Sequence, residues 1–189
     1  MLQINEILGN KAPLQILHYL AAHTTEDISF TQLERKTELS PATIAKWLKE
    51  LENGHLISHR SLGNMKLYSI EKEHPLVKQL NILYTLNELL PLRDIGRQFG
   101  CTIYLYGSCA RGENTEHSDI DLLIIADISK EDKDKWMKIQ NSIETFRAKK
   151  KLPISMFSLQ LRNSLDWAQI ARKDPAFYER VEKDKIQIV

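Results

Sequence analysis

Two pairs of residues in this sequence have types and spacing that could do chemistry together. Asp119 and Asp121 alternate at the start of an apolar run, residues 122–125, that predicts a β-strand, so their side chains share one face. Neighbouring carboxylates repel each other unless they are solvated or hold a cation, and Mg²⁺ prefers carboxylate oxygens together with substrate phosphates. The spacing therefore predicts that Asp119 and Asp121 bind Mg²⁺, or Mn²⁺ in its place.

The second pair, Gly107-Ser108, is suited to bind phosphate. It follows a β-branched and aromatic run, residues 102–106, and precedes residues 109–112, which begin a helix or a tight turn. Glycine lets the backbone approach a polyphosphate closely, while the following amides and the serine hydroxyl can donate hydrogen bonds to its oxygens. We expect this pair to bind a triphosphate beside the metal.

The string from Gly107 to Asp121, GSCARGENTEHSDID, closely resembles the signature of the polymerase-beta-like nucleotidyltransferase superfamily, especially its minimal nucleotidyltransferases. The resemblance implies a mixed sheet flanked by helices over about residues 100–161, with the triphosphate at the glycine-serine pair. It implies that the two aspartates hold Mg²⁺ and are the catalytic residues. Arg111 would stabilise the loop or the phosphates, and Ser118 would orient the aspartate loop. The nucleotide-binding residues predicted in this way are Gly107, Ser108, Arg111 and Ser118.

A third carboxylate is the part of the family pattern that is missing. Members that catalyse transfer generally add one from a later strand, which completes a two-metal site and helps to activate the attacking hydroxyl. The expected strand, residues 152–159, contains no acidic residue, and Ser155 occupies the place. A serine hydroxyl is a poor metal ligand and a poor base, so we expect a weakly bound second metal and slow chemistry. Poorer substitutes, at a strand end, on a helix or on the surface, are Asp127, Asp132, Asp134 and Asp166.

The first third of the chain has the pattern of several short helices. Thr31 followed three positions later by Glu34 is the arrangement of a capping box. Ser40-Pro41 is a clearer start signal, because serine caps free amides and proline suits the first helical position. With apolar residues at helical spacing, these signals predict three helices, over residues 11–22, 31–37 and 41–52.

A hairpin follows the predicted helices. Asn53-Gly54 can supply the left-handed end of the third helix, and segments 56–61 and 65–70 then flank Leu62-Gly63-Asn64. Three helices and a hairpin in this order resemble the winged-helix family of DNA-binding domains over about residues 11–70. The third helix would enter a DNA groove and the hairpin would contact backbone phosphates. The predicted DNA-binding residues are Thr43, Lys46, Lys49, Arg60 and Lys66.

The charge of the chain leaves the partner of the winged helix open. The formal net charge is +1 and neither half is strongly basic, so binding to double-stranded DNA would depend on a local patch. The alternative is a module that docks a partner protein or dimerises, with Lys46 and Lys49 simply solvated. Because helix-turn-helix modules often bind paired half-sites as dimers, a homodimer is one expected assembly.

Composition indicates an ordinary globular protein, with 42% hydrophobic and 27% charged residues. Its apolar runs are too short to cross a bilayer and no basic-then-apolar leader is present, so we expect a cytoplasmic protein with no membrane partner. We expect Cys101 and Cys109 to be free thiols. The predicted class is α+β, with a winged helix over residues 1–75, a helical linker over 76–99 and a small mixed-sheet nucleotidyltransferase-like domain flanked by helices over 100–189.

Two functions are compatible with these patterns. The first is a nucleotidyltransferase that binds a nucleoside triphosphate and Mg²⁺ and transfers the nucleoside monophosphate to a hydroxyl acceptor, with the winged helix targeting or regulating it. The second is a DNA-binding transcriptional regulator whose nucleotidyltransferase-like domain is catalytically weak or inactive and serves as a nucleotide sensor or a partner-docking domain. The sequence identifies neither the base of the nucleotide nor the acceptor for either function.

Overall fold

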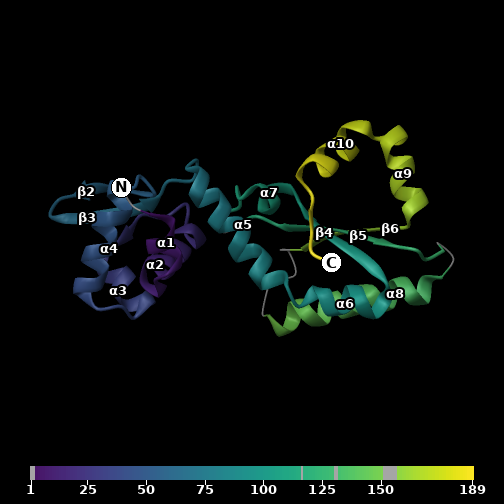
Figure 1. Ribbon diagram of the computed structural model, residues 1–189, viewed down its shortest axis with the longest axis horizontal. Helices are drawn as coiled ribbons and strands as arrows, with labels where there is room; N and C mark the ends of the chain where they lie inside the picture. The colour runs from purple at the N-terminus through teal and green to yellow at the C-terminus, as the bar shows by residue number, and fades with distance from the viewer. Residues whose placement is uncertain (1–2, 116, 130–131, 151–156) are drawn as a thin grey trace. The chain divides into compact units, whose positions relative to one another are not determined.

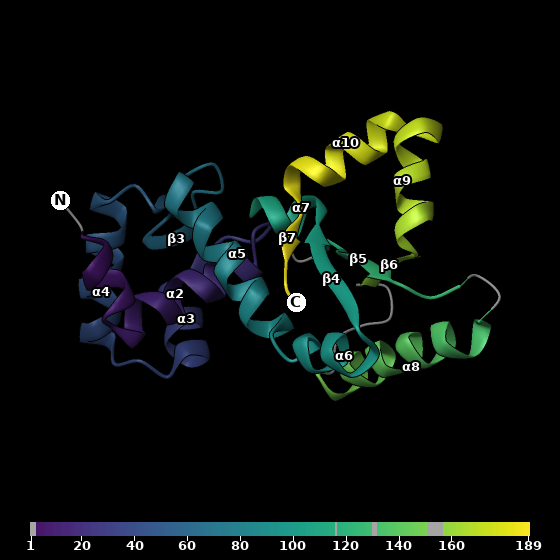
Figure 2. The same cartoon turned by 45° about the vertical axis from the view of Figure 1, so that its right-hand side comes forward.

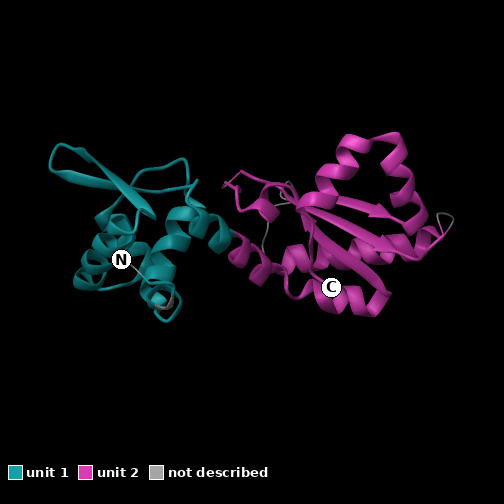
Figure 3. Ribbon diagram, turned by 45° about the horizontal axis from the view of Figure 1, so that its top comes forward, with its two compact units in different colours: residues 1–81 teal, residues 82–189 magenta. Residues whose placement is uncertain are grey.

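The structure is a computed structural model that describes residues 3–115, 117–129, 132–150 and 157–189. The chain divides into two compact units, Met1–Asn81 and Ile82–Val189, which Figure 3 shows in different colours. Both units contain helices and a small sheet, so the predicted α+β class is confirmed. No helix within the described residues is both long and apolar enough to span a membrane.

Helices make up most of the first unit, and a small sheet completes it (Figure 1). Its elements are α1 (Ile4–Leu8), α2 (Lys11–Ala22), β1 (Ile28–Ser29), α3 (Phe30–Thr37), α4 (Pro41–Asn53), β2 (Ile57–Leu62) and β3 (Met65–Ile70). The three predicted helices are present as α2, α3 and α4, and α1 is an addition that the sequence patterns missed. The helices enclose an apolar core that includes Leu17, Leu20, Leu33, Ile44 and Leu51.

The cap of α3 differs from the one predicted. The Ser29 hydroxyl accepts a hydrogen bond from the Gln32 amide at 3.3 Å, and Gln32 Oε1 accepts one from the Ser29 amide at 2.8 Å. These two bonds form the capping box, so the prediction of a box between Thr31 and Glu34 is wrong. Ser29 caps the helix because β1 holds it in the extended conformation that a cap requires, with φ −74° and ψ 160°.

The start of α4 is as predicted and its end is not. Ser40 caps α4 by accepting a hydrogen bond from the Thr43 amide at 3.2 Å. At the other end Gly54 has φ −82°, and the left-handed residue is His55 with φ 56°. The left-handed turn therefore comes one residue later than the sequence indicated.

The hairpin of the first unit is the predicted wing. β2 and β3 pair antiparallel as far as Leu62 opposite Met65, so the turn contains only Gly63 and Asn64. Gly63 has φ +59°, as tight two-residue hairpin turns require. β1 pairs with the other edge of β3, and the strand order is β1-β3-β2. The three helices α2, α3 and α4 and the two-stranded wing make this unit a winged helix.

Two helices occupy the segment that the sequence suggested as a linker. They are α5 (Pro75–Leu89) and α6 (Leu92–Phe99). Leu89 and Leu92 are fully buried in the core of the second unit, and α6 packs on strand β4 and helix α8. The later part of this segment therefore belongs to the second unit.

A mixed sheet forms the centre of the second unit, as predicted. Its strands are β4 (Cys101–Tyr106), β5 (Ile120–Ala126), β6 (Phe157–Arg162) and β7 (Ile186–Gln187), in the order β6-β5-β4-β7. β4 pairs antiparallel with β5 and β7, whereas β5 and β6 are parallel. A parallel pair needs a crossover, which α8 (Lys133–Lys149) supplies. A short helix, α7 (Gly107–Arg111), joins β4 to the loop before β5.

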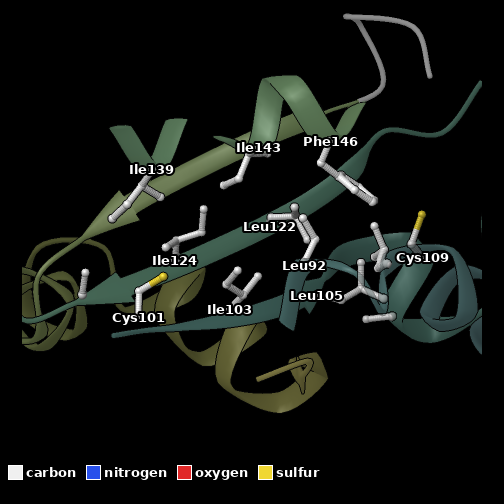
Figure 4. Packing of buried hydrophobic residues seen from close by; sticks show 13 residues of the cluster. Leu92, Cys101, Ile103, Leu105, Cys109, Leu122, Ile124, Ile139, Ile143 and Phe146 are labelled. Carbon is white, nitrogen blue, oxygen red and sulfur yellow. The ribbon is translucent and has the colours of Figure 1, made fainter. Parts of the chain in front are cut away.

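The two faces of this sheet are covered differently. On one face, α6 and α8 bury a large apolar cluster, in which Ile139, Ile143 and Phe146 of α8 lie over Leu122 and Ile124 of β5 (Figure 4). The other face carries helices α9 (Ser164–Lys173) and α10 (Pro175–Asp184), visible in Figure 2. Their contacts with it form a smaller cluster around Tyr106, Leu123, Trp167 and Val181. Because side chains alternate along a strand, Asp121 lies on this second face together with Leu123.

Candidate nucleotide and metal site

The Gly107-Ser108 pair and Asp121 meet at the ends of the two central strands of the sheet, β4 and β5. β4 and β5 pair as far as Tyr106 opposite Asp121, so the next residue, Gly107, begins α7 directly beside that carboxylate. Gly107 has φ +76°, and a Cβ built there would overlap with Asp121 Oδ2 and lie 3.2 Å from its Cγ. Only glycine meets both conditions, because other residues avoid positive φ and would displace the aspartate.

The residue opposite Asp121 on the neighbouring parallel strand is Ser158. The register pairs Asp121 with Ser158, whose hydroxyl is within hydrogen-bonding reach of the Asp121 carboxylate and of the Tyr106 hydroxyl. The predicted substitute for the third carboxylate, Ser155, lies outside the described residues. The position facing Asp121 in the described sheet carries the hydroxyl of Ser158.

Sequence reasoning missed Ser158 although a signal for it was present. Polar residues alternate with Phe157, Leu159 and Leu161, which is the pattern of a strand with one buried face. The strand pattern thus begins at Phe157, and its polar face carries Ser158, Gln160 and Arg162.

The Asp121 carboxylate is half-buried and electrostatically strained. Burial first, and then the nearby charge of Asp119, raise the pKa of Asp121 above its ordinary value, although Ser158, Arg111 and Arg180 each act to lower it. A group in this position gains from a bound cation, which would offset both the desolvation and the repulsion. The pair of carboxylates, with Asp119 exposed beside Asp121, is a donor set that fits one divalent cation.

The protein supplies few further metal ligands. Among the described residues, no group of three or more histidine, cysteine, aspartate or glutamate side chains is placed to hold a metal ion. A cation at Asp119 and Asp121 would therefore complete its coordination with phosphate oxygens and water, as Mg²⁺ usually does.

Cys109 fixes the position of Asp119, a role that the sequence did not suggest. Its thiol donates a hydrogen bond to the backbone carbonyl of Asp119 at 3.3 Å, which joins α7 to the start of β5. Burial, followed by the charge of Asp121, raises the pKa of Cys109 to about 11, so the thiol stays protonated and can donate. Cys101 and Cys109 are both buried and free, as expected.

Arg111 and Ser118 both make contacts that order the loop. Arg111 Nε donates to Glu113 at 2.8 Å and its Nη1 donates to Asp184 at 2.7 Å. The Ser118 hydroxyl accepts a hydrogen bond from the Thr115 amide at 2.8 Å, in the turn before β5. Ser108 follows Gly107 in α7 and is half-buried beside these groups.

The predicted DNA-binding residues of α4 lie on its outer surface or close to it. Ile44, Trp47, Leu48 and Leu51 form the buried face of the helix. Lys46 and Lys49 are exposed, and Lys46 Nζ lies 5.0 Å from the centroid of the Trp47 ring. Thr43 is half-buried, with its hydroxyl 2.8 Å from that of Ser40.

The two predicted residues of the wing are also exposed. Lys66 follows the turn and stands opposite Ser61 in the ladder. Arg60 Nε forms an ion pair with Asp27 at 2.6 Å. Such exposed pairs contribute little stability, so Arg60 could exchange this partner for a phosphate.

A glycine-serine turn against paired aspartates on a mixed sheet defines a nucleotidyltransferase-type domain. Residues 101–184 match the model of the family described as polymerase beta, nucleotidyltransferase, so the second unit carries a domain of this family. The comparison with curated proteins found no match.

Parts of this chain are similar to solved structures. A homodimeric winged helix-turn-helix DNA-binding domain from Mycobacterium bovis is 22% identical, with a TM-score of 0.38 over 45% of this chain and 75% of that one. A zinc-responsive MarR family member from Lactococcus lactis is 22% identical, with a TM-score of 0.37 over 48% of this chain and 62% of that one. A proposed nucleotidyltransferase from Sulfolobus solfataricus is 18% identical, with a TM-score of 0.37 over 61% of this chain and 88% of that one.

Proposed function

We propose that the second unit binds a nucleoside triphosphate with Mg²⁺ and transfers the nucleoside monophosphate to a hydroxyl group of an acceptor. The observation that carries this proposal is the contact of Gly107 with Asp121. It joins a turn suited to phosphate and a carboxylate suited to a cation at one edge of the sheet. The match of residues 101–184 to the nucleotidyltransferase family supports the same type of reaction.

Each residue of the site has a part in the proposed reaction. Asp119 and Asp121 are the proposed metal ligands and catalytic residues. Bound Mg²⁺, or Mn²⁺, would neutralise phosphate charge and polarise the reacting phosphorus centre. Gly107 leaves room for the triphosphate, and the Ser108 hydroxyl donates a hydrogen bond to it. The remaining predicted nucleotide-binding residues, Arg111 and Ser118, hold the loop in place through the contacts described above.

Ser158 limits the rate in this proposal. Transfer requires that the acceptor hydroxyl lose its proton, and a carboxylate accepts a proton far better than a serine hydroxyl at neutral pH. Within the described strands the position facing Asp121 holds Ser158, whose hydroxyl is a poor base, and the Asp121 carboxylate is itself a proposed metal ligand. We therefore expect slow transfer.

The test is nucleotidyl transfer by the whole chain. The protein is incubated with each of the four α-labelled nucleoside triphosphates, with Mg²⁺ or Mn²⁺ and with candidate hydroxyl acceptors, and pyrophosphate release and label transfer are measured. Asp121→Asn should abolish both signals, and Asp94→Asn, at an exposed aspartate in the first turn of α6, is the matched control. If the parent releases no pyrophosphate with any nucleotide and either metal, the transferase proposal fails.

A second candidate is a DNA-binding regulator whose second unit binds nucleotide as a signal or docks a partner. The specific observation in its favour is Ser158, because nucleotide binding survives the loss of a third carboxylate more readily than catalysis does. The two candidates differ in the transfer activity expected of the parent, before a carboxylate is placed at position 158. A sensor would gain transfer activity, whereas a transferase would already have it.

For the first unit we propose binding to double-stranded DNA. Lys46 and Lys49 on the outer surface of α4, with Thr43, would meet the groove, and Arg60 and Lys66 of the wing would contact backbone phosphates. A homodimer on paired half-sites is the expected assembly, and docking of a partner protein is the alternative. The exposure of both lysines beside a buried apolar face supports this arrangement.

A further inference from the structure

Arg111 is already neutralised by acidic partners. Its guanidinium binds Glu113 and Asp184 together, and the Asp184 side chain is only 12% exposed. A triphosphate beside Asp119 and Asp121 brings several more negative charges. A cation that is not already shared between two carboxylates is better suited to make charge-assisted hydrogen bonds to such a group.

A second guanidinium reaches the site from α10. Phe177, Arg180 and Asp184 are spaced three and four residues apart and so lie on one face of the helix. Phe177 packs edge-on against Tyr106, with ring centroids 6.2 Å apart, and Asp184 binds Arg111 at the end of α7. Arg180 lies between these two anchors, and in Figures 1 and 2 the C-terminal end of α10 comes beside α7.

The surroundings of Arg180 leave its charge available. It is exposed, its Cζ lies 5.7 Å from the centroid of the Phe177 ring, and no carboxylate of the described residues forms an ion pair with it. Its charge reaches the site as that of Arg111 does, because Arg111 and then Arg180 lower the pKa of Asp121, and Arg180 also lowers the pKa of Tyr106. The aromatic ring beneath the guanidinium restricts its motion without neutralising it.

We propose that Arg180 of α10 binds the β- and γ-phosphates of the nucleoside triphosphate, whereas Arg111 serves to join α7 to α10. This inference rests on the proposed function, and it specifies which part of the substrate is recognised and by which helix. A guanidinium can bind two phosphate oxygens at once. Because a monophosphate lacks the β- and γ-phosphates, Arg180 would select a triphosphate over a monophosphate. α10 would then complete the nucleotide site, although it lies about 60 residues beyond the signature segment.

The test compares four proteins by isothermal titration calorimetry: the parent, Arg180→Ala, Arg180→Lys and Arg172→Ala. Arg172 is an exposed arginine in the last turn of α9 and serves as the control. The probes are non-hydrolysable α,β-methylene nucleoside triphosphates, inorganic tripolyphosphate and nucleoside monophosphates, each with Mg²⁺. Tripolyphosphate makes the measurement independent of the unknown base.

For Arg180→Ala we expect triphosphate and tripolyphosphate affinity to fall by about tenfold or more, from the loss of one charge-assisted contact. Monophosphate affinity should change by less than about twofold, Arg180→Lys should be intermediate and Arg172→Ala should match the parent. Equal affinities in the parent and Arg180→Ala would overturn the inference while leaving the proposed function intact. An equal loss for all probes would overturn it too, because it would show that Arg180 supports the fold. A parent that binds neither triphosphate nor tripolyphosphate would remove both the proposed function and this inference.

Arg111→Ala provides the complementary measurement. Loss of the Arg111–Asp184 bond should lower the melting temperature of the nucleotide-free protein, whereas Arg180→Ala should leave it unchanged. If Arg111→Ala leaves the melting temperature unchanged and reduces tripolyphosphate affinity more than Arg180→Ala does, the two roles are reversed and the inference is wrong.

Discussion

The backbone of Gly107 lies against the carboxylate of Asp121, and even a methyl group at position 107 would overlap with it. Gly107 follows the last residue of β4 and begins α7, whereas Asp121 is the second residue of β5. The glycine-serine turn and the Asp121 carboxylate are therefore packed directly against each other.

Gly107→Ala should disrupt the contact between Gly107 and Asp121 in two ways. The new Cβ would displace Asp121, and alanine is strained at φ +76°. We expect stability to fall by about 1–3 kcal/mol and Mg²⁺-nucleotide affinity to fall sharply, measured by thermal unfolding and calorimetry.

Gly100→Ala is the matched control for this substitution. Gly100 has a similar φ of +61°, but a Cβ there would meet nothing within 4 Å. It should lose stability from backbone strain alone and keep its nucleotide affinity. Equal loss of nucleotide affinity in both variants would show that the overlap with Asp121 is unimportant.

Asp121→Asn should stabilise the metal-free protein near neutral pH. Burial raises the pKa of Asp121 in the folded state, so the folded protein binds the proton more tightly than the unfolded chain and its stability falls as pH rises through that pKa. Asparagine carries no charge, so it removes this loss of stability. In melting experiments without metal, the variant should exceed the parent at pH 7, and the difference should shrink below about pH 4, where the carboxyl is protonated in both states.

With Mg²⁺ present, the parent should be more stable than Asp121→Asn. Mg²⁺ should raise the melting temperature of the parent and have little effect on Asp121→Asn, because a ligand that binds only the folded state stabilises it. If Mg²⁺ raises the melting temperature of Asp121→Asn as much as that of the parent, the metal binds elsewhere.

Ser158→Asp should supply a carboxylate facing Asp121 on the neighbouring strand. If proton removal from the acceptor limits the parent, transfer should rise by about 100-fold or more, measured as pyrophosphate release under Mn²⁺ and Mg²⁺. Ser158→Asn has nearly the same size and no charge, so it should not show the gain. A parent that already transfers rapidly, with no gain from Ser158→Asp, would exclude the sensor function.

Lys46→Ala should weaken DNA binding by the first unit if the outer surface of α4 meets DNA. Loss of one positive charge at the DNA surface should reduce the slope of log affinity against log salt by about 1 in a gel-shift titration at several salt concentrations. Lys11→Ala, an exposed lysine at the start of α2, is the control and should bind as the parent does. Binding that is unchanged by Lys46→Ala would favour protein docking as the role of the winged helix.

The sequence by itself determined the parts whose signals are local. The Gly107 to Asp121 string carries the phosphate turn and both aspartates within one strand, turn and strand, so its spacing alone predicted their meeting. Ser40-Pro41 likewise predicted the start of α4, because a cap depends on the few residues that follow it. The start of α3 was not determined locally: β1 pairs with β3 and holds Ser29 extended, and Ser29 instead of the predicted Thr31 caps the helix.

Only the tertiary structure decided which distant residues complete the site. Ser158 faces Asp121 because β5 and β6 pair in parallel across the α8 crossover, and no local pattern specifies that register. The same holds for α10, which brings Asp184 to Arg111 and places Arg180 beside the site. These contacts depend on how α10 packs against β4 and α7, and that packing comes from burial of side chains far apart in the chain.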